Sequence, residues 1–320
     1  MPLVDMPLEE LKRYRGTNPC PPDIDEFWEA SLAEMRAVDP QPAYLPSDFT
    51  CPYADCFDLY FTGVRNARIH AKFARPKKIE GKAPAVLMFH GYTGDCGEWQ
   101  GLLPYAAAGF VVAALDCRGQ GGLSEDTGGV KGNTQHGHII RGLDDEPKNL
   151  LMRHIFLDTA EIAAIVMALP EVDETRVGAF GGSQGGALTL ACAALEPRIR
   201  RLAPSISFLC DYRRVWEMDL AGKDAYAEIV EYFRHFDPRH EREEEIFTKL
   251  GYIDDQHLAK RIRGRALIGV GLMDTVCPPS TQFAAYNRIT SEKEILVYPD
   301  FAHEALPGFA DRTFEFMLGL

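Results

Sequence analysis

The sequence predicts a three-layer α/β protein, in which a mostly parallel sheet is covered by helices on both faces. Short apolar runs recur from residue 83 onward, and the longer segments between them include several with helical periodicity. These runs are continuously apolar and do not alternate with polar residues, which is typical of strands buried on both faces. Together the two observations favour helices packed on either side of one sheet.

Length and composition predict a single domain over residues 1–320. The chain has 46% hydrophobic and 25% charged residues, and its size is near the limit at which one core stops growing. Its formal net charge of -13 would repel nucleic acids and anionic membranes, so we expect neither as a partner. A neutral small-molecule substrate fits this charge better.

The sequence pattern favours a cytoplasmic location with reduced thiols. The first residues carry acids and prolines where a signal peptide needs a basic start and an apolar run. No stretch approaches the roughly 18 apolar residues of a membrane span. The eight cysteines are scattered and form no CxxC pair.

The predicted elements follow in chain order. A helical extension occupies residues 1–45, with a helix over 23–38 whose apolar residues have helical spacing. Two strands at 57–64 and 67–77 form an antiparallel pair across a short polar turn. The remaining strands are expected at 84–90, 110–116, 176–182, 202–209, 265–274 and 294–300. Residues 211–262 are too long for a simple crossover and predict a helical insertion before the strand that ends in Asp274.

Ser183 lies in the segment Gly181-Gly182-Ser183-Gln184-Gly185, between a predicted strand and a predicted helix. This is the context of a nucleophile elbow, where a sharp turn exposes the serine and glycines such as Gly181 and Gly185 leave room for it. The alternative is a tight turn whose serine merely caps the helix. Strand and helix on the correct sides favour the elbow.

A nucleophilic serine needs a base that is oriented by an acid. In an α/β-hydrolase the chain order is Ser, then Asp or Glu, then His. Asp274 and His303 follow later strands in that order, and their side chains are expected beyond the carboxyl ends of those strands. Asp300 and Glu304 flank His303, but neighbouring residues rarely face the same ring nitrogen, so Asp274 is favoured.

The oxyanion of the transition state needs hydrogen-bond donors. The backbone N–H of Gln184 is one candidate, and the N–H of Tyr92 in the His90-Gly91-Tyr92 segment is the other. His136 and His138 suggest a metal pair, but without a nearby cysteine or a second HxH they are interpreted as loop histidines.

The chain resembles carbohydrate esterase family seven, the acetyl xylan esterase and cephalosporin-C deacetylase group. The resemblance is carried by Arg118-Gly119-Gln120, by the GGSQG elbow and by His303-Glu304, and it covers nearly the whole chain. It implies an α/β-hydrolase fold with Ser183 as nucleophile, His303 as base, Asp274 as acid, and Tyr92 and Gln184 as the oxyanion hole. It also implies no metal or cofactor and a homohexamer.

By this resemblance we expect a serine esterase that deacetylates small substrates, such as xylo-oligosaccharide acetates and cephalosporin C. Arg118 is expected to tie its loop near the elbow through its planar fork of donors, with Gly119 and Gln120 beside it. The loops around Tyr92 and after His303 depart from the family pattern and border the acyl pocket. A broader carboxylesterase or a peptidase is the enzymatic alternative, and a non-catalytic binding protein of the same fold is the alternative from another class.

Overall fold

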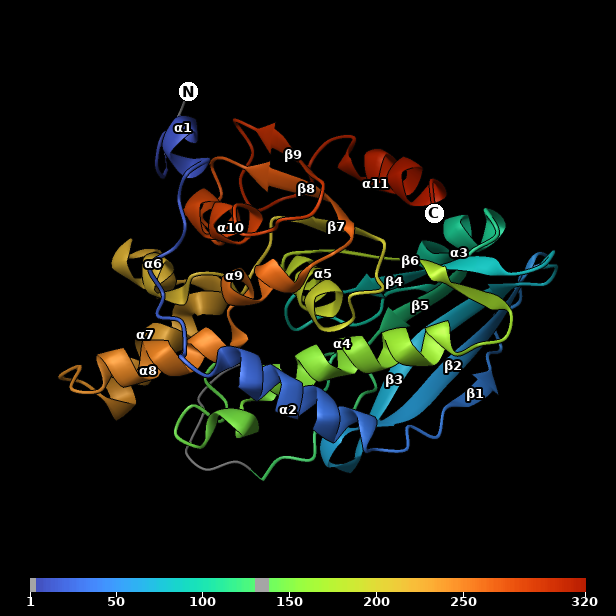
Figure 1. Cartoon of the computed structure of the whole chain (residues 1–320), viewed down its shortest axis with the longest axis horizontal. Coiled ribbons are helices and arrows are strands. Elements are labelled where there is room, and N and C mark those ends of the chain that lie inside the picture. Colours follow the sequence, from blue (N-terminus) through green and yellow to red (C-terminus); the bar gives the residue numbers. More distant parts are fainter. Residues whose placement is uncertain (1–3, 130–137) are drawn as a thin grey trace.

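The computed structural model describes residues 4–129 and 138–320 (Figure 1). One nine-stranded sheet has the order β1-β2-β3-β5-β4-β6-β7-β8-β9. Its strands are β1 Ala43–Pro46, β2 Ala54–Gly63, β3 Ala67–Pro76, β4 Ala83–Phe89, β5 Val111–Leu115, β6 Val172–Gly182, β7 Arg201–Ser205, β8 Arg265–Gly271 and β9 Lys293–Tyr298. The strands from β5 to β9 in this order are parallel to one another, and the β1, β2 and β3 end is antiparallel.

Helices cover both faces of the sheet, which confirms the predicted fold class. Helix α3 and helix α11 lie on one face, while α4 and α5 lie on the other, with α2 packed outside α4 (Figure 1). The helices are α1 Leu8–Leu11, α2 Ile24–Arg36, α3 Trp99–Ala107, α4 Leu151–Met167, α5 Gln184–Leu195, α10 Pro279–Tyr286 and α11 Phe309–Leu318. Helix α4 is buried along nearly all of its length because it lies between α2 and the sheet.

The continuous apolar runs have a simple cause in β4. Leu87 and Phe89 belong to the larger core under α4 and α5, whereas Val86 and Met88, which alternate with them along the strand, belong to the core under α3. Successive side chains of a strand point to opposite faces. A strand with a helical layer on each side therefore needs an apolar residue at every position.

The antiparallel end differs from the prediction in one strand. The pairing of β2 with β3 is confirmed, with a short turn at Val64–Asn66. Strand β1 was not predicted; it pairs with β2 at the edge of the sheet. Its four residues are mostly exposed, so no apolar periodicity marks it in the sequence.

Between β7 and β8 the chain forms a layer of short helices. These are α6 Tyr212–Glu217, α7 Ala227–Phe236, α8 Glu243–Leu250 and α9 Asp255–Leu258, joined by 3-10 turns. They fall within the segment predicted as a helical insertion. Tyr226, Tyr232, Phe233 and Phe247 are buried there, so the insertion has an aromatic core of its own that joins the main one.

The N-terminal segment packs on the last third of the chain (Figure 1). Asn287 donates its side-chain N–H to the carbonyl oxygens of Leu11 and Tyr14, at 2.8 and 2.7 Å. Leu11 is buried against Val270 and Phe283. Among the described residues, no helix is long and apolar enough to cross a membrane.

Candidate active site

Ser183 connects β6 to α5 in a conformation that serine rarely adopts, with φ 57° and ψ -119°. The turn is fixed on both sides of the residue. The Ser183 N–H donates to the carbonyl oxygen of Ser205 at 3.0 Å, and the Phe208 N–H donates to the Ser183 carbonyl oxygen at 3.1 Å. The strained backbone is therefore held by the end of β7 and by the segment that directly follows it.

The glycines beside Ser183 are required by close packing. A Cβ atom on Gly181 would lie 2.5 Å from the Phe89 carbonyl oxygen, and one on Gly185 would lie 2.0 Å from the same atom. Real Cβ atoms do not approach backbone oxygens this closely. Glycine at both positions lets the elbow pass directly over the end of β4.

The structure brings the sequence-predicted nucleophile, base and acid into one hydrogen-bonded line. Ser183 Oγ lies 2.9 Å from His303 Nε2, and His303 Nδ1 lies 2.9 Å from Asp274 Oδ2. The Asp274 carboxylate is fully buried, while the His303 side chain is 21% exposed. This arrangement can carry a proton from the serine hydroxyl to the imidazole.

The surroundings of Asp274 fix its orientation. Its Oδ1 accepts the backbone N–H groups of Val276 and Cys277, at 2.9 and 2.7 Å, which leaves Oδ2 facing His303. The rival Glu304 instead accepts the N–H of Ala302 at 3.1 Å. In this geometry His303 pairs with Asp274, while Glu304 pairs with the backbone of its own loop.

Tyr92 and Gln184 lie on two segments that meet through Gln120. The Gln120 and Gln184 side-chain amides contact each other, with N–O distances of 2.7 and 3.0 Å. Gln120 Oε1 also accepts the backbone N–H of Thr93 at 2.9 Å. Gln120 therefore connects the loop that carries Tyr92 to the first turn of α5.

Arg118 holds its loop through the planar guanidinium, with partners on α4 and after β2. Its guanidinium donates to both carboxylate oxygens of Asp158 on α4, at 2.7 and 2.6 Å, and to the Val64 carbonyl oxygen at 3.1 Å. It thus ties its loop to α4 and to the end of β2, and the direct link to the elbow is made by Gln120. Gly119 between them has φ 70°, a left-handed conformation that glycine adopts without strain.

The histidines named from the sequence lie in different settings. His90 accepts the Cys117 N–H at Nε2 and contacts the Gly91 carbonyl oxygen through Nδ1, and burial lowers its pKa. Burial also lowers the pKa of His138, to about 4. His136 lies outside the described residues.

One cluster away from the elbow joins three residue types that bind metals, His70, Cys96 and Asp116. Its contacts describe a hydrogen-bonded junction. Asp116 accepts backbone N–H groups from Cys96 and Leu123, at 2.6 and 2.8 Å, and lies 2.6 Å from His70 Nδ1. These contacts occupy the carboxylate without a metal ion, and the expectation that the protein binds no metal stays a prediction.

Glu228 on α7 was not among the predicted site residues. Its carboxylate is 3% exposed and accepts the Tyr92 hydroxyl together with backbone N–H groups of residues 138–140. Burial raises its pKa, although these hydrogen bonds oppose the shift. A signal was present, because Glu228 lies on the same helical stripe as the buried Ile229, Tyr232 and Phe233.

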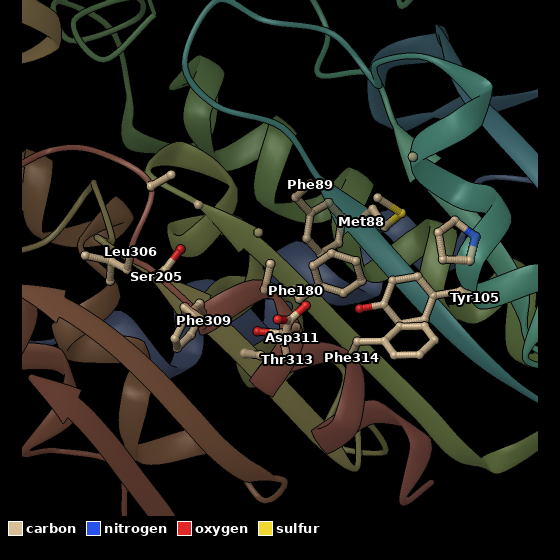
Figure 2. A pocket seen from close by; sticks show the side chains of 17 residues that line it. Met88, Phe89, Tyr105, Phe180, Ser205, Leu306, Phe309, Asp311, Thr313 and Phe314 are labelled. Atoms are coloured by element: carbon tan, nitrogen blue, oxygen red, sulfur yellow. The ribbon is translucent and has the colours of Figure 1, made fainter.

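A pocket of about 650 Å³ lies behind the elbow, on the face covered by α3 and α11 (Figure 2). Aromatic side chains such as Tyr105, Phe180 and Phe309 line it, and it reaches the histidine loop at Leu306. Ser183 is not part of its wall. Its wall does include Gly181 and Gly182, so the pocket borders the segment that directly precedes the serine.

Comparison with known proteins gives consistent matches. The family model of acetyl xylan esterase (AXE1) matches residues 1–320. The structure is similar to acetyl xylan esterase 1 from Thermoanaerobacterium sp. JW/SL YS485, with 62% identity, a TM-score of 0.97, and coverage of 98% of this chain and 99% of that chain. The acetyl xylan esterase from Paenibacillus sp. R4 is 33% identical, with a TM-score of 0.93 and the same coverage. Acetyl esterase Axe7A of Xylanibacter ruminicola is 30% identical over 304 residues, which are 92% of this chain, and the chain spans 65% of that relative's length.

Proposed function

Because the chain belongs to the acetyl xylan esterase family, we propose that it is a serine esterase that removes acetyl groups from small acetylated carbohydrates. One observation carries the proposal, namely the hydrogen-bonded line from Asp274 through His303 to the Ser183 hydroxyl. Hydroxyl, imidazole and carboxylate in this order are what acyl transfer through a serine requires.

In the first half of the reaction, Ser183 Oγ attacks the acetyl carbonyl carbon while His303 Nε2 takes the hydroxyl proton. Asp274 holds the imidazole in the tautomer that leaves Nε2 free to accept, and it stabilises the imidazolium that forms. The tetrahedral intermediate then collapses. The bond to the sugar oxygen breaks, His303 returns its proton to that oxygen, and the acetyl group stays on Ser183.

In the second half, a water molecule takes the place of the sugar alcohol. His303 removes a proton from the water as its oxygen attacks the acetyl-serine carbonyl. Collapse of the second intermediate releases acetate, and the proton returns to Ser183 Oγ. The proposed steps use only the side chains and backbone groups of this chain and water.

The backbone N–H groups of Tyr92 and Gln184 are the proposed donors for the oxyanion. Gln184 is the first residue of α5, so its N–H belongs to the helix N-terminus and faces outward along the helix axis. A donor of this kind typically lowers the activation barrier by about 3 kcal/mol, which accelerates the reaction on the order of a hundredfold.

The substrates that we propose are acetate esters of xylo-oligosaccharides and cephalosporin C. Both solved structures compared above are acetyl xylan esterases, which supports the first class. Cephalosporin C rests on the family resemblance alone. A broader carboxylesterase or a peptidase would use the same triad, so the acyl group has to be tested directly.

We further propose a cytoplasmic homohexamer. All eight cysteines are free thiols in the structure, which supports a reducing compartment. The hexamer rests on family resemblance, and we expect no nucleic acid or membrane partner because of the net charge of -13.

The test is the hydrolysis of p-nitrophenyl acetate, butyrate and octanoate by the wild type and by Ser183→Ala. We expect acetate to be the best substrate and the variant to lose about a millionfold in rate. Ser291→Ala is a matched control. The Ser291 hydroxyl donates to the Gly264 carbonyl oxygen before the first residues of β8 and β9, at the end of these strands away from the Ser183 site. A Ser183→Ala variant with a tenth of the wild-type rate would overturn the assignment, and a preference for octanoate would favour a broader carboxylesterase.

A further inference from the structure

Glu228 is an acidic residue from the helical insertion that lies buried among donors. Its Oε2 accepts the N–H groups of Ile139 and Ile140 at 2.8 and 3.1 Å, and its Oε1 accepts the N–H of His138 at 3.2 Å and the Tyr92 hydroxyl. Three consecutive backbone N–H groups that converge on one carboxylate form an anion-binding nest. The carboxylate is therefore fixed in position before any substrate arrives.

Tyr92 is anchored through its side chain by this arrangement. Its ring makes edge contacts with His138 and Phe208, with ring centroids 5.4 and 5.3 Å apart, and its hydroxyl accepts the His138 N–H at 2.8 Å while donating to Glu228. At its other end the same residue carries the backbone N–H that we assign to the oxyanion hole. The phenol and the donor N–H are parts of one residue, so fixing the first restricts the second.

The loop needs such an anchor because it has little regular structure. Between the end of β4 at Phe89 and the start of α3 at Trp99 the chain forms only turns. Gln120 holds the loop at the Thr93 N–H. The loop is also held at Gly94, whose carbonyl oxygen accepts the Gly121 N–H at 3.0 Å, and at the Cys96 N–H, which donates to Asp116 at 2.6 Å. The hydroxyl and ring contacts of Tyr92 are the ones that fix this residue itself.

We propose that Glu228 is a positioning residue for ester hydrolysis, which holds Tyr92 so that its backbone N–H faces the oxyanion. This inference rests on the proposed function of the Ser183 site. Glu228 would touch neither substrate nor nucleophile. Its contribution would be made entirely through the direction of one donor, and a displacement of about 1 Å in such a group can cost on the order of a hundredfold in rate.

The proposal predicts a loss in kcat with little change in KM. The oxyanion forms only in the transition state, so a misdirected donor weakens transition-state binding and leaves ground-state binding nearly intact. Tyr92→Phe removes the hydroxyl and keeps the ring, while Glu228→Gln keeps the shape and removes the charge. We expect each to lower kcat for p-nitrophenyl acetate by about tenfold or more. The double variant should lose little beyond either single variant, because both break the same link.

A second readout separates positioning from general destabilisation. The ketone 1,1,1-trifluoroacetone is attacked by a serine hydroxyl to give a hemiketal whose oxygen occupies the oxyanion hole, so its inhibition constant should rise in parallel with the loss in kcat. Tyr232→Phe is the matched control. Tyr232 lies on the same helix and donates to the Asp144 carboxylate at 2.6 Å, a phenol-to-carboxylate bond of the same kind outside the site.

The outcomes are distinct. The proposal is supported if Tyr92→Phe and Glu228→Gln both have a lower kcat and a higher inhibition constant for trifluoroacetone. Tyr232→Phe should keep the wild-type kcat and inhibition constant. The proposal is overturned if the kcat of Tyr92→Phe stays within twofold of the wild-type value. Tyr92→Phe is the milder of the two substitutions, so this outcome can be measured even where Glu228→Gln does not fold. The proposal is also overturned if Tyr232→Phe loses as much as the others, since the effect then reflects stability. If Ser183→Ala keeps its activity, the proposed function fails instead.

Discussion

The ion pair between Arg118 and Asp158 allows a quantitative prediction. Both side chains are fully buried, and the guanidinium donates two hydrogen bonds of 2.7 and 2.6 Å to the carboxylate. Each charge-assisted bond contributes about 1.5–3 kcal/mol. Arg118→Met removes both and leaves a buried carboxyl without its cation, so we expect a loss of about 3–5 kcal/mol in the free energy of unfolding. Arg118→Lys should lose less, because an ammonium retains the charge and gives up the bidentate geometry.

The loss should depend on pH with a defined sign. Burial raises the pKa of Asp158 even beside the guanidinium. Without Arg118 the folded state therefore binds a proton more readily than the unfolded state does, and stability falls as pH rises above the ordinary range of an aspartate. The cost of Arg118→Met should be smaller at pH 5.5 than at pH 8.

Urea unfolding followed by circular dichroism at these two pH values measures both effects. Arg312→Met is a matched control, because Arg312 pairs with Glu315 at 2.8 Å on an exposed surface, where a pair contributes at most about 1 kcal/mol. The double variant Arg118→Met with Asp158→Leu should recover part of the loss, since no charge is then buried. A cost below 1 kcal/mol at pH 8, or a larger cost at pH 5.5, would refute the reasoning.

Two further predictions concern stability. Burial raises the pKa of Glu161 to about 8, so between about pH 4.5 and 8 the folded state keeps a proton that the unfolded state has lost, and stability should fall by about 1.4 kcal/mol per pH unit as pH rises. Glu161→Gln should remove this contribution to the pH dependence. If the urea midpoints of the wild type and of Glu161→Gln change with pH in parallel, the prediction is wrong. The backbone of Ser183 has a φ of 57°, a conformation that only glycine adopts freely. The Ser183→Gly variant should therefore be about 1 kcal/mol more stable than Ser183→Ala. Equal urea midpoints for the two variants would show that the elbow is unstrained.

Much of the fold was predictable because its signals are local. The apolar run of a strand such as β4 can be read from its own residues alone. The order of Ser183, Asp274 and His303 along the chain can be compared directly with the known order in α/β-hydrolases. Strand β1 was missed for the complementary reason. It is exposed at the edge of the sheet, where pairing with β2 and not side-chain burial defines it.

The contacts that support the site were not predictable from spacing. Asp158 is 40 residues from Arg118, Gln184 is 64 residues from Gln120, and Glu228 is 136 residues from Tyr92. Nothing in one sequence indicates which of many polar residues will meet across such separations. A charged residue on a buried helical stripe, as at Glu228, does indicate that some partner exists.

The packing of the N-terminal segment on Asn287 has a consequence for synthesis. Residues 11–15 leave the ribosome long before residues 287 and 288, which supply their hydrogen-bond partners. At about 5–20 residues per second, some 270 residues take on the order of tens of seconds to translate. During that interval Leu11 has no apolar surface to cover it, and the loop that carries His303 does not yet exist. A nascent chain therefore becomes a complete fold and a complete triad at nearly the same moment, and a chain that stops before residue 274 has neither.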